Sequence, residues 1–137
     1  MNSESIPEYK IILASNSSIR QKILEDSGIS FEVVPSEVEE EELKQSLSGN
    51  NFREYCLTLA KAKALDVSNK KKNAYVIGSD QICSYGEEIF SKPLTKENCF
   101  KTLSKLSGNT HYQNCGISIC KNGKEIWSHY ALSLIHI

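Results

Sequence analysis

The chain has 137 residues, of which 39% are hydrophobic and 24% are charged. This composition supports one folded domain with a single core, and it excludes both a disordered chain and a protein of several domains. Sixteen Lys and Arg residues against seventeen Asp and Glu residues leave a formal net charge of −1. No overall positive field would therefore attract polymeric nucleic acid or an anionic membrane, and an anionic ligand must be held by local clusters of charge.

The sequence shows no sign of a membrane span or a disulfide framework. No stretch approaches the roughly 18 consecutive apolar residues of a spanning helix, and the opening MNSESIPEYK lacks the order of a signal peptide. The chain has five cysteines, which is an odd number, and no two of them are spaced as Cys-x-x-Cys. We therefore expect a cytoplasmic protein with reduced, mostly buried thiols.

The first part of the chain reads as a strand, a helix and a second strand. Residues 10–14 (KIILA) form an apolar run that stops at the polar residues 15–18. A helix capped by a serine of this turn should follow and end near Gly28, before a strand at 31–34. The five carboxylates within residues 37–42 predict a surface loop or the start of a helix.

The middle of the chain alternates between helix and strand signals. Apolar side chains at helical spacing predict an amphipathic helix over residues 51–65, with capping-box spacing at its start. Residues 74–77 read as a buried strand that we expect to end at the polar segment 78–81. A short strand at 88–90 and a helix over 95–108 should follow.

The last part reads as a β-hairpin. Residues 110–120 and 124–132 flank an Asn-Gly pair, which favours a tight turn. Helices interleaved with strands predict an α/β fold, and the hairpin predicts a mixed sheet. Residues 133–137 follow without a turn or cap. We expect one domain over 1–137 that is cut short there, with these last residues non-native.

Two places combine polar side chains with a structural reason to be held still. Backbone N–H groups at the turn before the first helix could bind an anion, and Arg20 could add a bidentate phosphate contact. The alternative is that the serines of this turn only cap the helix. Asp80 follows a buried strand, where a carboxylate can act as a general base or hold Mg²⁺. The alternative there is a solvated turn residue.

Other charged residues are candidates only in combination. Lys63 and Lys92 could clamp phosphates, and the Glu39-Glu40 pair could coordinate a metal, although each is individually typical of a surface. Walker-type and dinucleotide-binding motifs are absent from the sequence. Cys83 would need a histidine such as His111 to act as a nucleophile, and nothing in their spacing brings them together.

Six segments, taken in order, resemble the Maf family of nucleoside triphosphate pyrophosphatases. The first resembles the family's opening L-A-S-x-S-P-R-R, and the second its acidic V-D-E. The others match L-A-x-x-K-A, V-I-G-[AS]-D-[TQ], K-P and L-S-G-x-x-H. In this chain they are LASNSSIR (13–20), VEE (38–40), LAKAKA (59–64), VIGSDQ (76–81), KP (92–93) and LSGNTH (106–111).

The resemblance implies a mixed twisted sheet with helices on both faces and a central cleft, as in Maf and inosine-triphosphatase-like proteins. It implies hydrolysis of a nucleoside triphosphate between the α and β phosphates, which gives a monophosphate and pyrophosphate. Members of the family are often dimeric, so it also implies a homodimer. The family continues for about a third of its length beyond the last residue of this chain.

The resemblance also implies roles for individual residues. Cationic side chains and one serine would bind the triphosphate, and three carboxylates would hold Mg²⁺, with Mn²⁺ or Co²⁺ as alternatives. One of these carboxylates, that of Asp80, would also deprotonate or position the attacking water. The residues are Ser15, Arg20, Lys63 and Lys92 for the triphosphate, and Glu39, Glu40 and Asp80 for the metal.

The positions of Ile19 and Gln81 help to choose the base in the family. Asp80-Gln81 resembles the subgroup that acts on 7-methyl-GTP, whereas the dTTP/UTP subgroup usually has Asp-Thr and keeps Arg at the position of Ile19. The methylated-base subgroup tends to carry an aromatic residue at the position of Ile19, so the resemblance leaves the preferred base open.

Two other classes of function stay open at this stage. One is a nucleotide-binding or regulatory module without turnover, related to cell division. The other is a thiol-dependent enzyme that uses Cys83 as its nucleophile. The first predicts stabilisation by a nucleotide without release of pyrophosphate, and the second predicts loss of activity on alkylation.

Overall fold

The computed structural model describes residues 9–47, 51–90 and 93–137. Within these ranges, six strands form one sheet in the order β2-β1-β3-β5-β6, with β4 paired to β3. β1 runs parallel to β2 and β3, and the other pairs are antiparallel, so the predicted mixed sheet is confirmed. The strands are β1 (Ile11–Leu13), β2 (Glu32–Val33), β3 (Tyr75–Tyr85), β4 (Glu88–Phe90), β5 (Thr110–Lys121) and β6 (Lys124–His136).

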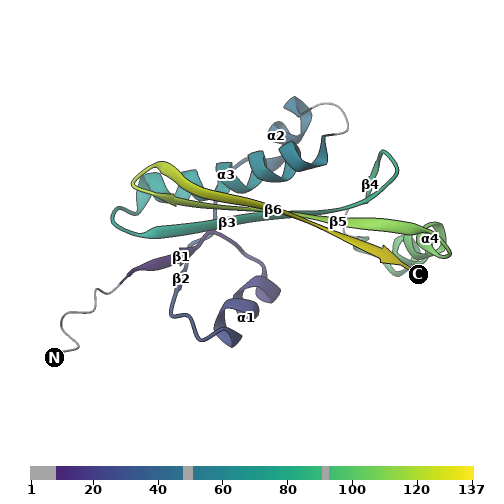
Figure 1. Cartoon of the computed structure of the whole chain (residues 1–137), viewed down its shortest axis with the longest axis horizontal. Coiled ribbons are helices and arrows are strands. Elements are labelled where there is room, and N and C mark those ends of the chain that lie inside the picture. Colours follow the sequence, from purple (N-terminus) through teal and green to yellow (C-terminus); the bar gives the residue numbers. More distant parts are fainter. Residues whose placement is uncertain (1–8, 48–50, 91–92) are drawn as a thin grey trace.

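Helices lie on both sides of this sheet. α3 and α2 lie on one side of the long ribbon of β3, β5 and β6, and α1 lies on the other side (Figure 1). The predicted α/β fold with helices on both faces is therefore confirmed. No helix in the described ranges is both long and apolar enough to cross a membrane. The helices are α1 (Ser18–Asp26), α2 (Glu40–Ser46), α3 (Phe52–Lys70) and α4 (Lys96–Leu106).

Local sequence signals set the helix starts and the hairpin. The N-cap side chains of Ser17, Asn51 and Thr95 each accept a hydrogen bond from the backbone N–H three residues later, at 3.0–3.3 Å. In the hairpin between β5 and β6, Asn122 and Gly123 have φ of 52° and 77°. These left-handed conformations are those that an Asn-Gly turn supplies.

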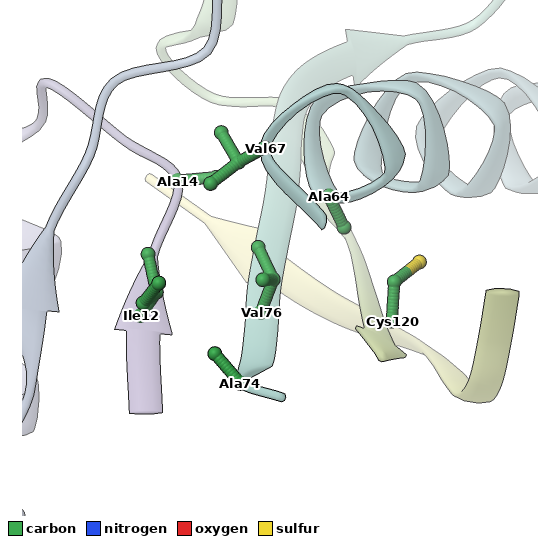
Figure 2. Close-up of a cluster of buried hydrophobic side chains, with 7 residues drawn as sticks. All are labelled: Ile12, Ala14, Ala64, Val67, Ala74, Val76 and Cys120. Atoms are coloured by element: carbon green, nitrogen blue, oxygen red, sulfur yellow. The ribbon is translucent and has the colours of Figure 1, made fainter. Parts of the chain in front are cut away.

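The core lies between α3 and the sheet. Buried apolar side chains from β1, α3, β3 and β5 meet there (Figure 2). Along β3 every second residue from Val76 to Ser84 is buried, because side chains alternate across a strand and one face is covered by α3. The central cluster consists of Ile12, Ala14, Ala64, Val67, Ala74, Val76 and Cys120.

The predicted end of the third strand at residues 78–81 is wrong. β3 continues to Tyr85 because β5 pairs with it from Val76 to Ser84, and this pairing satisfies the backbone groups of the polar segment. Asp80 consequently lies within β3, opposite Gly116, and not at a strand end. α3 is also longer than predicted, since it ends at Lys70.

Two glycines allow α3 to approach the sheet closely. A Cβ on Gly78 would lie 2.8 Å from the backbone nitrogen of Ala64, and closer still to the carbonyl oxygen of Ala60. A Cβ on Gly116 would lie 2.7 Å from the carbonyl group of Cys56. This close packing brings the Lys63 turn of α3 down to β3.

We expect Gly78→Ala to lower the free energy of unfolding by roughly 1–3 kcal/mol, because the added methyl group meets helix backbone that cannot rotate away. Urea denaturation measures the change. Ser79→Ala is a matched control on the opposite face of β3 and should change stability by at most about 0.5 kcal/mol. A Gly78→Ala protein that unfolds at the wild-type urea concentration would contradict the close approach.

Candidate active site

Lys63 joins two carboxylates at the edge of the core. Its Nζ lies 2.6 Å from Oε1 of Glu40 and 3.4 Å from Oδ1 of Asp80, and it donates to the carbonyl oxygen of Ser79 at 3.3 Å. The side chains of Lys63 and Asp80 are only 13% and 11% exposed, whereas that of Glu40 is 41% exposed. α2, α3 and β3 thus bring three of the predicted site residues together.

Asp80 is the most buried carboxylate of this cluster. Burial raises the pKa of Asp80, and this effect outweighs the opposing charge and hydrogen bond of Lys63. The Oδ2 atom of Asp80 is buried and has no hydrogen-bond partner among the described residues. Because an unpaired buried oxygen costs free energy, this atom is suited to accept a proton, a water molecule or a cation.

Glu40 behaves in the opposite way. Burial raises its pKa, but the hydrogen bond and charge of Lys63, with the charges of Lys44 and Arg20, outweigh burial, so the pKa of Glu40 is lowered. Glu40 therefore stays ionised at neutral pH beside a carboxyl group that holds its proton more tightly. Two carboxylates with opposite shifts can serve different roles in one site.

The third predicted metal ligand, Glu39, is the exposed N-cap residue of α2 and makes no side-chain capping bond. The described part of the chain contains no group of three or more His, Cys, Asp or Glu side chains placed to hold a metal ion. The structure therefore brings Glu40 and Asp80 to one lysine, and the participation of Glu39 stays a prediction.

The turn before α1 and the first turn of α1 carry the two other described residues predicted to bind phosphate. Ser15 is 8% exposed, and its Oγ accepts the backbone N–H of Ser17 at 3.0 Å. Arg20 is half-buried, and its charge acts on both Glu40 and Asp80, although less strongly than burial and Lys63. It makes no ion pair with another described residue. Helix capping by this turn is confirmed, and phosphate binding stays a prediction.

The structure does not place the remaining predicted residues in the Glu40–Lys63–Asp80 cluster. Lys92 lies outside the described residues. Ile19 is 71% exposed, and Gln81 is exposed, with its Nε2 donating to Oε1 of Gln113 at 3.1 Å. Because side chains alternate along β3, Gln81 lies on the opposite face from the buried Asp80.

Tyr55 is a further residue on which the charges of the acidic cluster act, and the sequence motifs did not single it out. Burial, followed by the negative charges of Asp80 and Glu41, raises the pKa of its phenol. The spacing of residues 52–63 predicts one helical stripe that includes both Tyr55 and Lys63. That shared stripe was the available signal, since both residues lie within its width.

The alternative nucleophile, Cys83, has the wrong environment for its role. Burial raises the pKa of the Cys83 thiol, whereas a nucleophilic cysteine needs a lowered pKa and a nearby base. His111 is 6% exposed, and its Nδ1 has no hydrogen-bond partner within the described ranges. The structure thus gives no support to a Cys83–His111 pair.

A cleft of about 710 Å³ opens at the N-terminal end of α3. Residues of α3, β3, β5 and β6 line it, among them Phe52, Tyr112 and Tyr130. None of the predicted site residues belongs to its lining. The Glu40–Lys63–Asp80 cluster is therefore a separate feature of the same side of the sheet.

The sequence is similar to curated proteins over almost its whole length. It is 38% identical to a nucleoside triphosphate pyrophosphatase of Legionella pneumophila (strain Corby), over 98% of this chain and 69% of the relative. It is also 38% identical to a 7-methyl-GTP pyrophosphatase of Brucella abortus biovar 1 (strain 9-941), over 90% of this chain and 63% of that relative.

The fold is similar to that of a solved HAM1 protein from Coxiella burnetii. The TM-score is 0.54 with 16% sequence identity, over 93% of this chain and 71% of the other. At this identity the likeness concerns the fold alone. The sequence model described as "Maf-like protein" matches residues 10–137, which include every predicted site residue. With the six ordered segments and the relatives at 38% identity, this match shows that the chain belongs to the Maf family.

Proposed function

We propose that this chain is a nucleoside triphosphate pyrophosphatase that cleaves between the α and β phosphates and releases a monophosphate and pyrophosphate. The observation that carries the proposal is the cluster in which Lys63 meets Glu40 and Asp80, with one oxygen of Asp80 buried and unpartnered. The names of the Legionella and Brucella relatives support this class of reaction.

The charge of the cluster supports the proposal that a divalent cation binds there. One lysine against two ionised carboxylates leaves one net negative charge, which would repel a triphosphate. Arg20 can offset this charge from α1, and Lys92 is proposed to do so from the K-P motif. A divalent cation on the two carboxylates would make the site attractive to phosphate oxygens.

The described residues fit such a cation. Mg²⁺ prefers oxygen ligands and is usually bound by one or two carboxylates together with substrate phosphates. Glu40 and Asp80 would hold it, since Oδ2 of Asp80 lacks any other partner in the described structure, and Glu39 is proposed as a third ligand. When bound, the metal neutralises phosphate charge; Mn²⁺ and Co²⁺ are the alternatives.

Asp80 is proposed to take the proton of the attacking water. A raised pKa makes a carboxylate a stronger base, which is the property that general-base catalysis needs. Lys63, Arg20, Lys92 and Ser15 would hold the phosphate oxygens and stabilise the charge of the transition state. Ile19 and Gln81 are proposed to choose the base, with 7-methyl-GTP and dTTP or UTP as the substrates to compare.

Release of pyrophosphate from a panel of standard and modified triphosphates tests the proposal. We expect release with Mg²⁺, loss of release with EDTA, and recovery when Mg²⁺ is added back. Thermal stabilisation by a nucleotide without pyrophosphate release would instead indicate the binding module. Activity that survives EDTA but not alkylation would indicate the thiol enzyme. The cytoplasmic location and the homodimer stay predictions.

A further inference from the structure

α2 begins in a run of four glutamates, residues 39–42, and charge alone does not say which of them meets Lys63. In the structure it is Glu40, at 2.6 Å. α2 has seven residues, none of which is buried, and its N-cap makes no side-chain capping bond. The helix therefore has little of its own to hold it in one register, and the contact that selects Glu40 must lie elsewhere.

The segment before α2 is attached to α3 through Asp66. Oδ2 of Asp66 accepts the backbone N–H of Glu37 at 2.9 Å and the hydroxyl of Ser36 at 3.5 Å. The Ser36 Oγ in turn accepts the backbone N–H of Val38 at 3.1 Å. The Asp66 side chain is 24% exposed, and hydrogen bonds to a carboxylate are stronger than those between neutral groups.

Asp66 and Lys63 act as two neighbouring contact points on one helix. They are three residues apart on α3, so their side chains lie on the same face. Their partners Glu37 and Glu40 are also three residues apart. With the Glu37 N–H held by Asp66, the two intervening residues bring Glu40 to Lys63. Each step along α2 turns the side chain by about 100°, which directs the next glutamate away.

We propose that Asp66 is a positioning residue that selects Glu40, among four consecutive glutamates, as the carboxylate that meets Lys63 and Asp80. The proposal rests on the proposed function, in which Glu40 helps to hold the metal and the triphosphate. Lys70 also pairs with Glu37, at 2.9 Å, but both side chains are largely solvent-exposed. Such surface pairs contribute little, so the backbone hydrogen bond to Asp66 carries the positioning.

Hydrogen exchange without any ligand tests the anchor itself. In Asp66→Ala we expect the hydrogen-bonded amides of α2, residues 43–47, to exchange about tenfold faster, while those of β3 are unchanged. Asp66→Asn keeps an oxygen that can accept the Glu37 N–H and should recover most of the protection. Asp26→Ala is the matched control, because it removes an exposed aspartate whose one ion pair among the described residues is with Lys22. It should change neither exchange nor activity.

A double-mutant cycle tests the selection of Glu40. Glu40→Gln should raise the KM for nucleotide and for Mg²⁺ much more in the wild type than in Asp66→Ala. Glu41→Gln should raise these KM values only in the Asp66→Ala background. Asp66→Asn, as the conservative variant, should restore the wild-type pattern in both comparisons.

Two results would overturn the proposed role of Asp66 and leave the proposed function intact. One is that the α2 amides of Asp66→Ala exchange at the wild-type rate. The other is that the KM changes of the single variants simply add in the double variants. If the wild-type protein releases no pyrophosphate, the proposed function fails. The exchange experiment then decides by itself whether Asp66 anchors α2, because it needs neither substrate nor metal.

Discussion

Asp80→Asn is expected to reduce the turnover number for pyrophosphate release by roughly 10²–10⁴-fold, the usual contribution of a general base. The amide has nearly the same shape as the carboxylate but cannot accept the proton of the attacking water. Lys63 keeps Glu40 as a partner in the variant, at 2.6 Å in the present structure. Because Asp80 is also proposed to hold the metal, the variant should need more Mg²⁺, and steady-state kinetics at saturating Mg²⁺ would show the loss in kcat. Wild-type turnover would remove Asp80 from the mechanism.

The pH dependence provides a second test of Asp80. Burial raises its folded-state pKa above the ordinary aspartate value of about 3.9, so between these two values the folded protein binds more protons than the unfolded chain. The free energy of unfolding then falls as pH rises through this window. Asp80→Asn should thus be as stable as the wild type at pH 7, or more so. The acid limb of the kcat/KM profile, which reports groups of the free enzyme, should disappear in the variant.

Lys63→Ala is expected to abolish measurable pyrophosphate release and to lower the free energy of unfolding by about 3 kcal/mol. The variant leaves Glu40 and Asp80 beside each other without their common cation. Removing one partner of a buried pair typically costs about 3–5 kcal/mol. The lower end applies because Glu40 is 41% exposed and can be solvated. Denaturant unfolding and a pyrophosphate assay measure the two effects.

Two substitutions on the same helix separate charge from packing. Lys63→Arg keeps the cation and should recover stability more than activity, because a planar guanidinium does not reproduce the position of an ammonium group. Lys61→Ala removes an exposed lysine of α3 and should leave stability within about 0.5 kcal/mol. If Lys63→Ala unfolds at the wild-type denaturant concentration, the cluster is solvated and the lysine does not stabilise it.

Elements whose ends depend on neighbouring residues could be predicted from the sequence. The helix starts at Ser17, Asn51 and Thr95 agree with the structure because a cap contacts a backbone N–H only three residues away. The turn between β5 and β6 could also be predicted from the sequence, since Asn and Gly are the residues that most readily adopt the left-handed conformations seen at Asn122 and Gly123.

The length of β3 could not be predicted from its own residues. The segment after Ile77 is polar and lacks the apolar run that indicates a buried strand. Its strand conformation comes from β5, which pairs with it as far as the Ser84–Tyr112 contact. A hydrogen-bonding partner that lies so far along the chain leaves no local signal, and this is why Asp80 was expected at a strand end.

The sequence by itself determined which functional groups this protein has: the carboxylates and cations of the six ordered segments, the helix caps and the tight hairpin turn. Only the tertiary structure decided that Asp80 faces Lys63, which is 17 residues away, and that Asp66 binds the backbone of Glu37, which is 29 residues away. The physical reason is that charge and conformational preference belong to single residues. The distance between two side chains depends on how a helix packs on a sheet.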